Sequence, residues 1–198
     1  MNFLAHLTLG YGNKDWIYGQ FIADAVKGKQ YEILPHSIKQ GVLAHRYVDH
    51  QTDSHQATLA LRALMREDFG LLTPIVIDVM FDHILAMRWE ELFTTSIDAE
   101  INHFHDILEN HPHPMPTRAK SLSQHLIQQQ WLKRYATHAG MEITFQQMGK
   151  RFPHGANLHH AMTTFGRFEV EIHSTFLLVY PEIRHACEKI MSTFGSHS

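Results

Sequence analysis

The sequence predicts an all-α fold in a single helical domain that spans residues 1–198. Apolar residues recur at helical spacing along most of the chain. Alternating β-branched runs are absent, and so are the Asn-Gly and Asp-Gly turns typical of β-hairpins. A length of 198 residues suits one domain with a sizeable core and is short for two. We therefore expect about six to eight helices in one bundle.

Capping residues indicate where the helices of the first half begin. We expect Asp15 to cap one helix, with Gly28 as its stop. Ser37-Ile38-Lys39-Gln40 has the form of a capping box and predicts the start of another. Thr73-Pro74 offers Thr as N-cap and Pro in the first helical position. The expected helical segments are 2–9, 15–28, 37–53 with a continuation over 57–66 after a break, and 73–92.

The second half is predicted in the same way. The segment 111–116 alternates His and Pro and is expected to be an extended connector, because proline interrupts helices. Ser121-Leu122-Ser123-Gln124 is a second capping box. We expect Pro181 to kink or interrupt the last helix. The expected helices are 97–110, one from Ser121 through Tyr135, one over 142–151 that stops at Pro153-His154-Gly155, and a long one from Asn157.

Histidine is the unusual entry in the composition, with 18 residues against 17 Lys and Arg together. Histidine is the commonest protein ligand for metals, so metal chemistry is expected. The single Cys187 excludes an internal disulfide and a thiolate cluster. The net charge of −3 gives no nucleic-acid footprint, and no apolar run approaches a membrane span. The N-terminus lacks the pattern of a secretory signal, so we expect a cytoplasmic protein.

Ionisable residues on apolar helix faces are the main indication of function, because buried charges must be paired or bind a cation. Asp24 lies within an apolar helical segment, where the alternative is a surface pair with Lys27. His45, Asp49 and Asp53 follow one another at four-residue spacing, which places them on one helix stripe. Two ligands at this spacing suit a metal site between helices, and the alternative is a solvated polar face.

An adjacent Asp82-His83 pair lies inside an otherwise apolar helix and is a third candidate. Both side chains can reach an ion at the helix surface, and Asp78, one turn earlier, can orient a ligand. His6 interrupts an apolar run and ranks below the others, because a lone histidine on such a face is more often a core residue. The remaining histidines, including His154 and His197, fall on polar faces, in loops or near the end of the chain.

These residues and their neighbours resemble the acyl carrier protein phosphodiesterase family in order and spacing. Weaker agreement around Trp131 and Tyr180 extends the resemblance over nearly the whole chain. Small departures occur, such as Gln20 where Asn is common, and we attribute them to packing. The segments that carry the resemblance are Met1-Asn2-Phe3-Leu4-Ala5-His6-Leu7, the stretch from Gly19 to Gly28, the stretch from His45 to Asp53, and the stretch from Asp78 to Leu85.

The resemblance implies an HD-like helical fold and a phosphodiesterase that needs a divalent metal, usually Mn²⁺, with Mg²⁺ or Fe²⁺ as other candidates. The family's reaction removes the 4′-phosphopantetheine arm from the serine of holo acyl carrier protein. Its essential aspartate falls on Asp24, and its HD-type pair falls on Asp82-His83. The expected metal ligands are Asp24, His45, Asp82, His83 and His6, and the expected catalytic residues are Asp24 and Asp49. Asp24 can ligate the ion or accept a proton from water, and the sequence does not separate these roles.

An acidic carrier protein needs a local basic patch on an enzyme that is itself slightly acidic. Lys27, Lys29 and Arg46 are the expected substrate-binding residues, and the alternative is that they are scattered surface charges. Two other functions stay open at this point. One is an HD-type phosphohydrolase of a small nucleotide, and the other is a non-catalytic histidine-rich metal-binding protein. The sequence does not indicate an oligomeric state.

Overall fold

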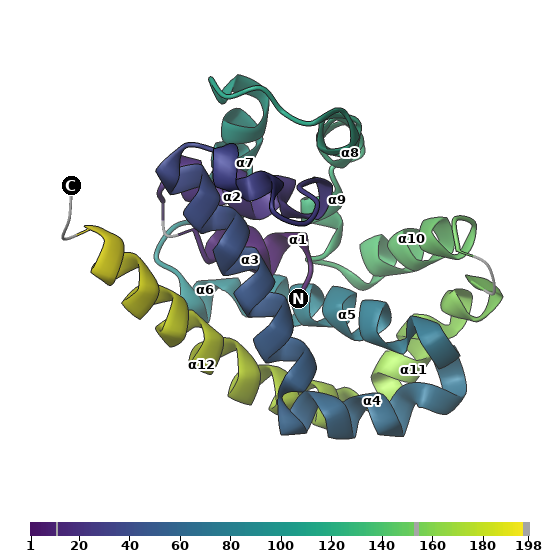
Figure 1. The fold of residues 1–198 in the computed structure, drawn as a ribbon. Helices are drawn as coiled ribbons and strands as arrows, with labels where there is room; N and C mark the ends of the chain where they lie inside the picture. The colour runs from purple at the N-terminus through teal and green to yellow at the C-terminus, as the bar shows by residue number, and fades with distance from the viewer. Residues whose placement is uncertain (11, 153–154, 196–198) are drawn as a thin grey trace.

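The computed structural model describes residues 1–10, 12–152 and 155–195. These residues form α-helices and short 3₁₀ turns and contain no strand, which confirms the all-α class (Figure 1). The 3₁₀ turns are Ala23–Ala25, Gln30–Ile33, Gly70–Leu72 and Gly155–His160. The α-helices are α1 (Phe3–Thr8), α2 (Lys14–Ile22), α3 (His36–Ser54), α4 (Gln56–Phe69), α5 (Thr73–Met87), α6 (Trp89–Leu92), α7 (Ile97–Asn110), α8 (Thr117–Gln128), α9 (Trp131–Arg134), α10 (His138–Gly149), α11 (Ala161–Arg167) and α12 (Glu169–Gly195).

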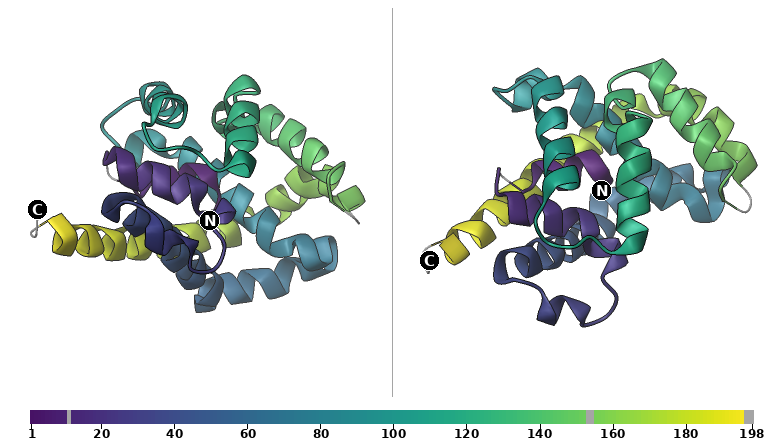
Figure 2. Two further views of the ribbon diagram at one scale, coloured as in Figure 1. Left: turned by 45° about the horizontal axis from the view of Figure 1, so that its top comes forward. Right: turned by 90° about the horizontal axis from the view of Figure 1, so that it is seen from above.

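Helix α5 is the central element, because most of its side chains are buried, whichever face of the helix they lie on. The short helix α1 packs against α2 and α5, and α2 packs against α3. Helix α12 runs along one side of the bundle and contacts α3, α4 and α5. Seen from above, α7 and α8 lie over α1 and α2, and α10 and α11 form a separate wing at the α5 side (Figure 2). The chain start is therefore enclosed between α3, α5 and the α8–α10 region.

Helices α2 and α3 cross at two glycines, Gly19 and Gly41. A Cβ atom at Gly19 would lie 2.3 Å from the Ile38 carbonyl oxygen, and one at Gly41 would lie 2.5 Å from the Trp16 carbonyl oxygen. Real Cβ atoms do not approach backbone that closely, so the crossing requires glycine on both helices. It fixes the spacing between the end of α2 and the middle of α3.

The start of α2 and of α3 differs from the prediction. Asn13, not Asp15, caps α2, with its side chain accepting a hydrogen bond from the Trp16 backbone N–H. Helix α2 ends at Ile22, six residues before Gly28, which adopts a left-handed φ of 53°. Helix α3 begins at His36 after Pro35, so the capping box predicted at Ser37 does not form. Proline pre-sets the backbone at the helix start without a side-chain cap.

The second half is divided into more helices than expected. The capping box at Ser121 was wrong, because α8 already begins at Thr117. A left-handed Gln130, with φ of 50°, separates α8 from α9, so the helix predicted to reach Tyr135 is broken. The predicted 97–110 helix and the extended connector after it are confirmed by α7.

The C-terminal helix is divided earlier than predicted. A break at Phe168 separates α11 from α12, whereas α12 continues through Pro181 without interruption. The expected stop at Pro153 and His154 lies outside the described residues, as does His197.

The stretch Gln56–Met87, which includes α4 and α5, is apolar enough over one 18-residue window to pass as a membrane span, with a mean hydropathy of 1.6. The sequence analysis expected no such run. However, 67% of that window is buried inside the protein. Its side chains thus pack as those of a core helix do.

Candidate active site

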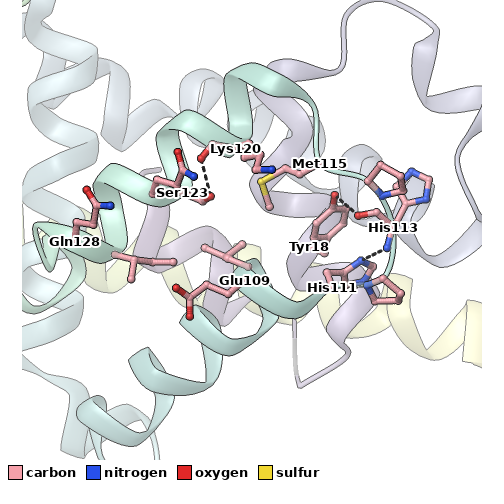
Figure 3. A pocket seen from close by; sticks show the side chains of 13 residues that line it. Tyr18, Glu109, His111, His113, Met115, Lys120, Ser123 and Gln128 are labelled. Atoms are coloured by element: carbon pink, nitrogen blue, oxygen red, sulfur yellow. Dashed lines mark hydrogen bonds between the residues drawn. The ribbon is translucent and has the colours of Figure 1, made fainter.

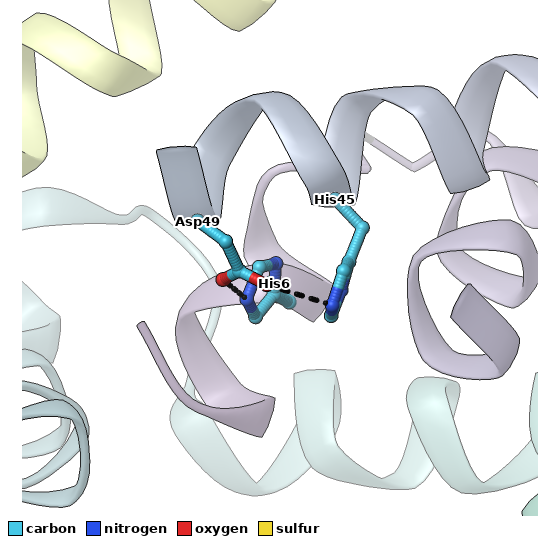
Figure 4. A group of neighbouring side chains, drawn as sticks. All are labelled: His6, His45 and Asp49. Atoms are coloured by element: carbon cyan, nitrogen blue, oxygen red, sulfur yellow. Dashed lines mark hydrogen bonds and ion pairs between the residues drawn. The ribbon is translucent and has the colours of Figure 1, made fainter. Parts of the chain in front are cut away.

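His6, His45 and Asp49 form a cluster between α1 and α3, which we call the His6–His45–Asp49 group (Figure 4). One ligand atom from each side chain lies within 4.8 Å of the others. Within residues 1–10, 12–152 and 155–195, no other three His, Cys, Asp or Glu side chains have this spacing. The four-residue spacing of His45 and Asp49 predicted two of the three residues, and α1 supplies the third, His6.

Asp49 bridges the two imidazoles of the group. Its Oδ1 lies 3.0 Å from His6 Nε2, and its Oδ2 lies 3.1 Å from His45 Nε2. The two rings stack with their centroids 4.0 Å apart. Both histidines are buried, whereas the Asp49 side chain is 41% exposed. The group therefore lies at the edge of the core and is open to solvent on one side.

Gln20 of α2 orients His6 from behind. Its side chain is fully buried, and its Oε1 lies 3.1 Å from His6 Nδ1. Burial and the nearby His45 lower the pKa of His6 to about 4, so the ring is neutral near pH 7. Its Nε2 faces two acceptors, Asp49 Oδ1 at 3.0 Å and the Met1 carbonyl oxygen at 3.1 Å, so without a cation Nε2 carries the ring proton and donates. A bound ion would require the other tautomer, in which Nδ1–H donates to Gln20 Oε1 and the Nε2 lone pair faces the ion. The sequence analysis assigned Gln20 to packing; its position as a polar residue within the buried run of α2 was the available signal.

Asp24 lies at the open edge of the group, on the 3₁₀ turn after α2. Its Oδ1 is 3.5 Å from His45 Nε2, and its side chain is 70% exposed. The His45 side chain lowers the pKa of Asp24, which keeps the carboxyl ionised. This position suits a group that meets water or substrate, more than it suits a core ion pair. The alternative pairing with Lys27 does not occur among the ion pairs of the described residues.

The charges of the group favour a cation. Burial acts to lower the pKa of His45, but the carboxylates of Asp24 and Asp49 outweigh it and raise the pKa to about 9. Burial acts to raise the pKa of Asp49, but His45 and His6 outweigh it and lower the pKa. Two carboxylates thus face one imidazolium and one neutral imidazole near pH 7. A divalent ion can replace the His45 proton, because metal binding requires the deprotonated ring.

Comparison with known proteins identifies the family. A family profile described as acyl carrier protein phosphodiesterase matches residues 1–183. The chain belongs to the acyl carrier protein phosphodiesterase family. It is 32% identical over 183 residues to the acyl carrier protein phosphodiesterase of Yersinia pestis, covering 91% of this chain and 94% of the relative. It is 30% identical over 189 residues to that of Photorhabdus laumondii subsp. laumondii, covering 95% and 96%. No solved structure matches it.

Asp82, the family's expected metal ligand, faces the start of α1. Its side chain is completely buried, and it accepts hydrogen bonds from the backbone N–H groups of Leu4 and Ala5, at 2.7 and 3.0 Å. Burial raises the pKa of Asp82 to about 7, although the two backbone donors act against this rise. The carboxyl therefore satisfies orphan N–H groups at the first turn of α1, the helix that carries His6.

His83 points elsewhere, although it is adjacent to Asp82. Its Nδ1 lies 2.5 Å from the Tyr135 carbonyl oxygen, and its ring lies edge-on to His138 and Phe165. Burial lowers the pKa of His83. The structure does not bring Asp82 or His83 into the His6–His45–Asp49 group. Their role as metal ligands in this phosphodiesterase family member stays a prediction.

Asp53 and Asp78, the other two aspartates considered from the sequence, also lie outside the group. Asp53 is exposed and forms an ion pair with Arg62. Asp78 lies 3.0 Å from the Met1 nitrogen through its Oδ1, and that nitrogen lies 3.7 Å from Asp49 Oδ1. Asp78 therefore reaches the group through the first residue and makes no direct contact with it.

The three expected substrate-binding cations lie on the segment that follows Asp24 or contact it, but they differ in their partners. Lys27 and Lys29 are exposed on the segment that follows the Asp24 turn. Arg46 donates to the carbonyl oxygens of Val26 and Gly28, at 2.7 and 2.9 Å. The Arg46 guanidinium thus holds the segment in place, and the two lysines are the cations that it presents.

Two cavities lie near the N-terminal helices, and one of them reaches the site. The larger, of about 630 Å³, is enclosed by Tyr18 of α2, the connector 111–116 and α8 (Figure 3). There the His111 ring stacks on Tyr18, with centroids 3.8 Å apart, and its Nε2 lies 3.0 Å from Asp15 Oδ1. The smaller cavity, of about 490 Å³, has Asp24 in its wall. The sequence analysis missed it, because its walls come from segments far apart in the chain.

Proposed function

We propose that this protein hydrolyses the phosphodiester between 4′-phosphopantetheine and the serine of holo acyl carrier protein, releasing apo acyl carrier protein. The supporting observation is that Asp24, ionised and exposed, lies 3.5 Å from His45, one of two buried imidazoles that share the partly exposed Asp49 carboxylate. The family membership supplies the substrate class, because the relatives are named acyl carrier protein phosphodiesterases. This favours the proposal over a nucleotide phosphohydrolase or a passive metal-binding protein.

The proposal includes a divalent metal ion held by His6, His45 and Asp49. The donor set of imidazole nitrogens and carboxylate oxygen fits Mn²⁺, and Mg²⁺ or Fe²⁺ are the other candidates. His45 supports this fit, because its buried Nδ1 has no hydrogen-bond partner among the described residues and its Nε2 lies against two carboxylates that would also attract a cation. When bound, such an ion would polarise the phosphoryl oxygens and lower the pKa of water.

Asp24 and Asp49 have different roles in the reaction. Asp24 accepts a proton from the attacking water, because it is the exposed carboxylate at the edge of the group. The new bond joins the water oxygen to phosphorus, and the bond between phosphorus and the serine oxygen breaks. The serine oxygen takes a proton from solvent. Asp49 keeps the two imidazoles in position, because it contacts both.

The carrier protein would dock beside Asp24. Lys27 and Lys29 supply positive charge there, and Arg46 fixes the segment that carries them. Complementary charge steers an acidic partner to this edge. The proposal also places the protein in the cytoplasm, in the lipid metabolism that acyl carrier protein serves, and gives it no nucleic-acid or membrane partner. An HD-like arrangement of the helices remains part of the proposal.

The decisive experiment incubates the purified protein with holo acyl carrier protein and Mn²⁺ and follows the carrier mass. The expected result is loss of the phosphopantetheine mass and appearance of the apo form. Two matched variants on α3 test the metal: Asp49→Asn should lower Mn²⁺ affinity measured by calorimetry, whereas Asp53→Asn, one turn further, should not. No conversion of several carrier proteins would overturn the substrate, and equal Mn²⁺ affinity of the two variants would overturn the metal site.

A further inference from the structure

The cavity beside Asp24 is lined by segments that are far apart in the chain, from Asn2 to Phe152. Asn2 and Phe3 form one wall, and Asp24 lies at its edge. Trp131 of α9, whose ring centroid lies 6.3 Å from that of Phe3, and Thr144 and Gln147 of α10 also line it. Because Asp24 also lies 3.5 Å from His45, the cavity and the candidate active site share this carboxylate.

The walls of this cavity are mostly apolar, with a few polar groups. Phe3, Trp131 and Phe152 supply aromatic surface. Polar side chains interrupt it, including the guanidinium groups of Arg118 and Arg151 and two primary amides. Each of the two amides already uses one of its groups within the protein. Asn2 Nδ2 donates to the Tyr135 hydroxyl at 2.9 Å, and Gln147 Oε1 accepts from Arg134 at 2.9 Å.

The remaining hydrogen-bonding groups of Asn2 and Gln147 are complementary to those of a ligand amide. Gln147 retains N–H donors, and Asn2 retains its carbonyl acceptor and a second N–H. A ligand that fits such walls is a flexible chain with apolar carbons and internal amides. A volume of about 490 Å³ is in the range of small-molecule pockets.

We infer that this cavity binds the pantetheine arm while the carrier protein stays outside. The inference rests on the proposed function. The arm is a linear chain with a dimethyl-bearing carbon, a hydroxyl, two amides and a terminal thiol, and it is joined to phosphate at one end. With the phosphate at Asp24, the chain runs along the aromatic walls, and its amides meet Asn2 and Gln147. The serine and the rest of the carrier lie on the other side of the phosphate, towards Lys27 and Lys29.

The larger cavity of Figure 3 does not compete for this role. None of the residues that line it belongs to the His6–His45–Asp49 group, and Asp24 is not among them. An arm bound there would have no contact with the candidate catalytic carboxylate. Cleavage at the phosphate requires that arm and phosphate occupy adjoining sites.

A cavity-filling substitution tests the inference with pantetheine as the probe, because pantetheine lacks both phosphate and carrier. Thr144→Phe places an aromatic ring in the cavity. Ile143→Phe, the next residue on α10, is the control, because Ile143 is 44% exposed and is not part of this cavity. Calorimetry should show pantetheine affinity lowered about tenfold or more in Thr144→Phe and unchanged in Ile143→Phe. Mn²⁺ affinity should be the same in both.

Pantetheine binding by Thr144→Phe with wild-type affinity would overturn the inference. If Thr144→Phe does not fold, the pair Gln147→Leu and Gln146→Leu replaces it, because Gln146 is exposed and lies outside the cavity. Equal pantetheine affinity of that pair would also overturn the inference. The proposed function fails separately, if the wild-type protein leaves holo carrier protein unconverted while pantetheine binds in the cavity.

Discussion

The Asp82 carboxyl and the His6–His45–Asp49 group both contact α1, but they differ in their hydrogen-bond partners. Asp82, from α5, gives its oxygens to the backbone N–H groups of Leu4 and Ala5. The His6–His45–Asp49 group, between α1 and α3, consists of side chains that face one another. Fixed backbone donors hold a carboxyl in one structural role. Titratable side chains that share one carboxylate can exchange a proton for a cation.

The largest effect is expected at the reactive edge of the group. Asp24→Asn removes the proton acceptor, and we expect kcat/KM for holo acyl carrier protein to fall about a thousandfold. The variant should stay folded with only a small loss of stability, because the side chain is 70% exposed and Asp49 still pairs with His45. Conversion of the carrier is followed by mass spectrometry. Asp98→Asn, exposed on α7 and paired with Lys133, is the control for loss of a carboxylate. Near-normal turnover in a folded Asp24→Asn protein would remove Asp24 from the mechanism.

Asp82→Ala tests whether Asp82 stabilises the fold through the backbone of α1. It leaves two N–H groups of α1 without their acceptor, and we expect the free energy of unfolding to fall by about 3 kcal/mol. Above pH 9, where His45 is neutral, Asp49→Ala should cost less stability than Asp82→Ala, and near pH 7 it should lower Mn²⁺ affinity. Urea unfolding and calorimetry measure the two quantities. A more stable Asp82→Ala than Asp49→Ala protein above that pH would reverse the assignment of the two carboxylates.

The pH dependence of stability tests the charges in the His6–His45–Asp49 group. Without metal, His45 titrates at a pKa of about 9 in the folded protein, against 6.5 for an ordinary histidine. A raised pKa contributes stability that is present below pH 6.5 and lost as pH rises through 9, by at most about 3 kcal/mol. Urea unfolding in a chelator should therefore show falling stability between pH 7 and 9. His45→Gln should lack this decline, and a decline of equal size in that variant would contradict its origin.

The smallest effect is expected at His83. His83→Gln removes the contact with the Tyr135 carbonyl, and we expect a loss of about 1 kcal/mol in the free energy of unfolding. Mn²⁺ stoichiometry, measured by metal analysis, should stay at the wild-type value. A lost equivalent of Mn²⁺ would show that His83 is a ligand after all.

The sequence predicts the parts of this molecule that depend on local signals. Helical periodicity was enough for the all-α class and for α7, because capping residues and apolar spacing act within one segment. The two capping boxes at Ser37 and Ser121 were misleading. Each helix begins four residues or fewer earlier, directly after a proline, at Pro35 and Pro116. Proline competes with a side-chain cap for the same role at a helix start.

Contacts between distant segments account for the rest. His45 and Asp49 follow from their spacing on one helix, but nothing in the spacing of α1 places His6 against them. His6 ranked below His83 because a lone histidine on an apolar face is more often a core residue, yet the structure places His6 in the group and His83 outside it. An adjacent Asp-His pair in an apolar helix looks like one site. Its two side chains leave the helix about 100° apart and reach different neighbours.

The crossing of α2 and α3 at Gly19 and Gly41 has a consequence for how this protein tolerates change. Asp24 follows Gly19 by five residues and His45 follows Gly41 by four, so both lie just beyond the crossing. Their separation is set by backbone resting on backbone, with no intervening side chain whose size could alter it. Substitutions elsewhere in the core can change packing without moving these two residues apart. The pair of glycines therefore sets how far apart the segments that carry Asp24 and His45 lie.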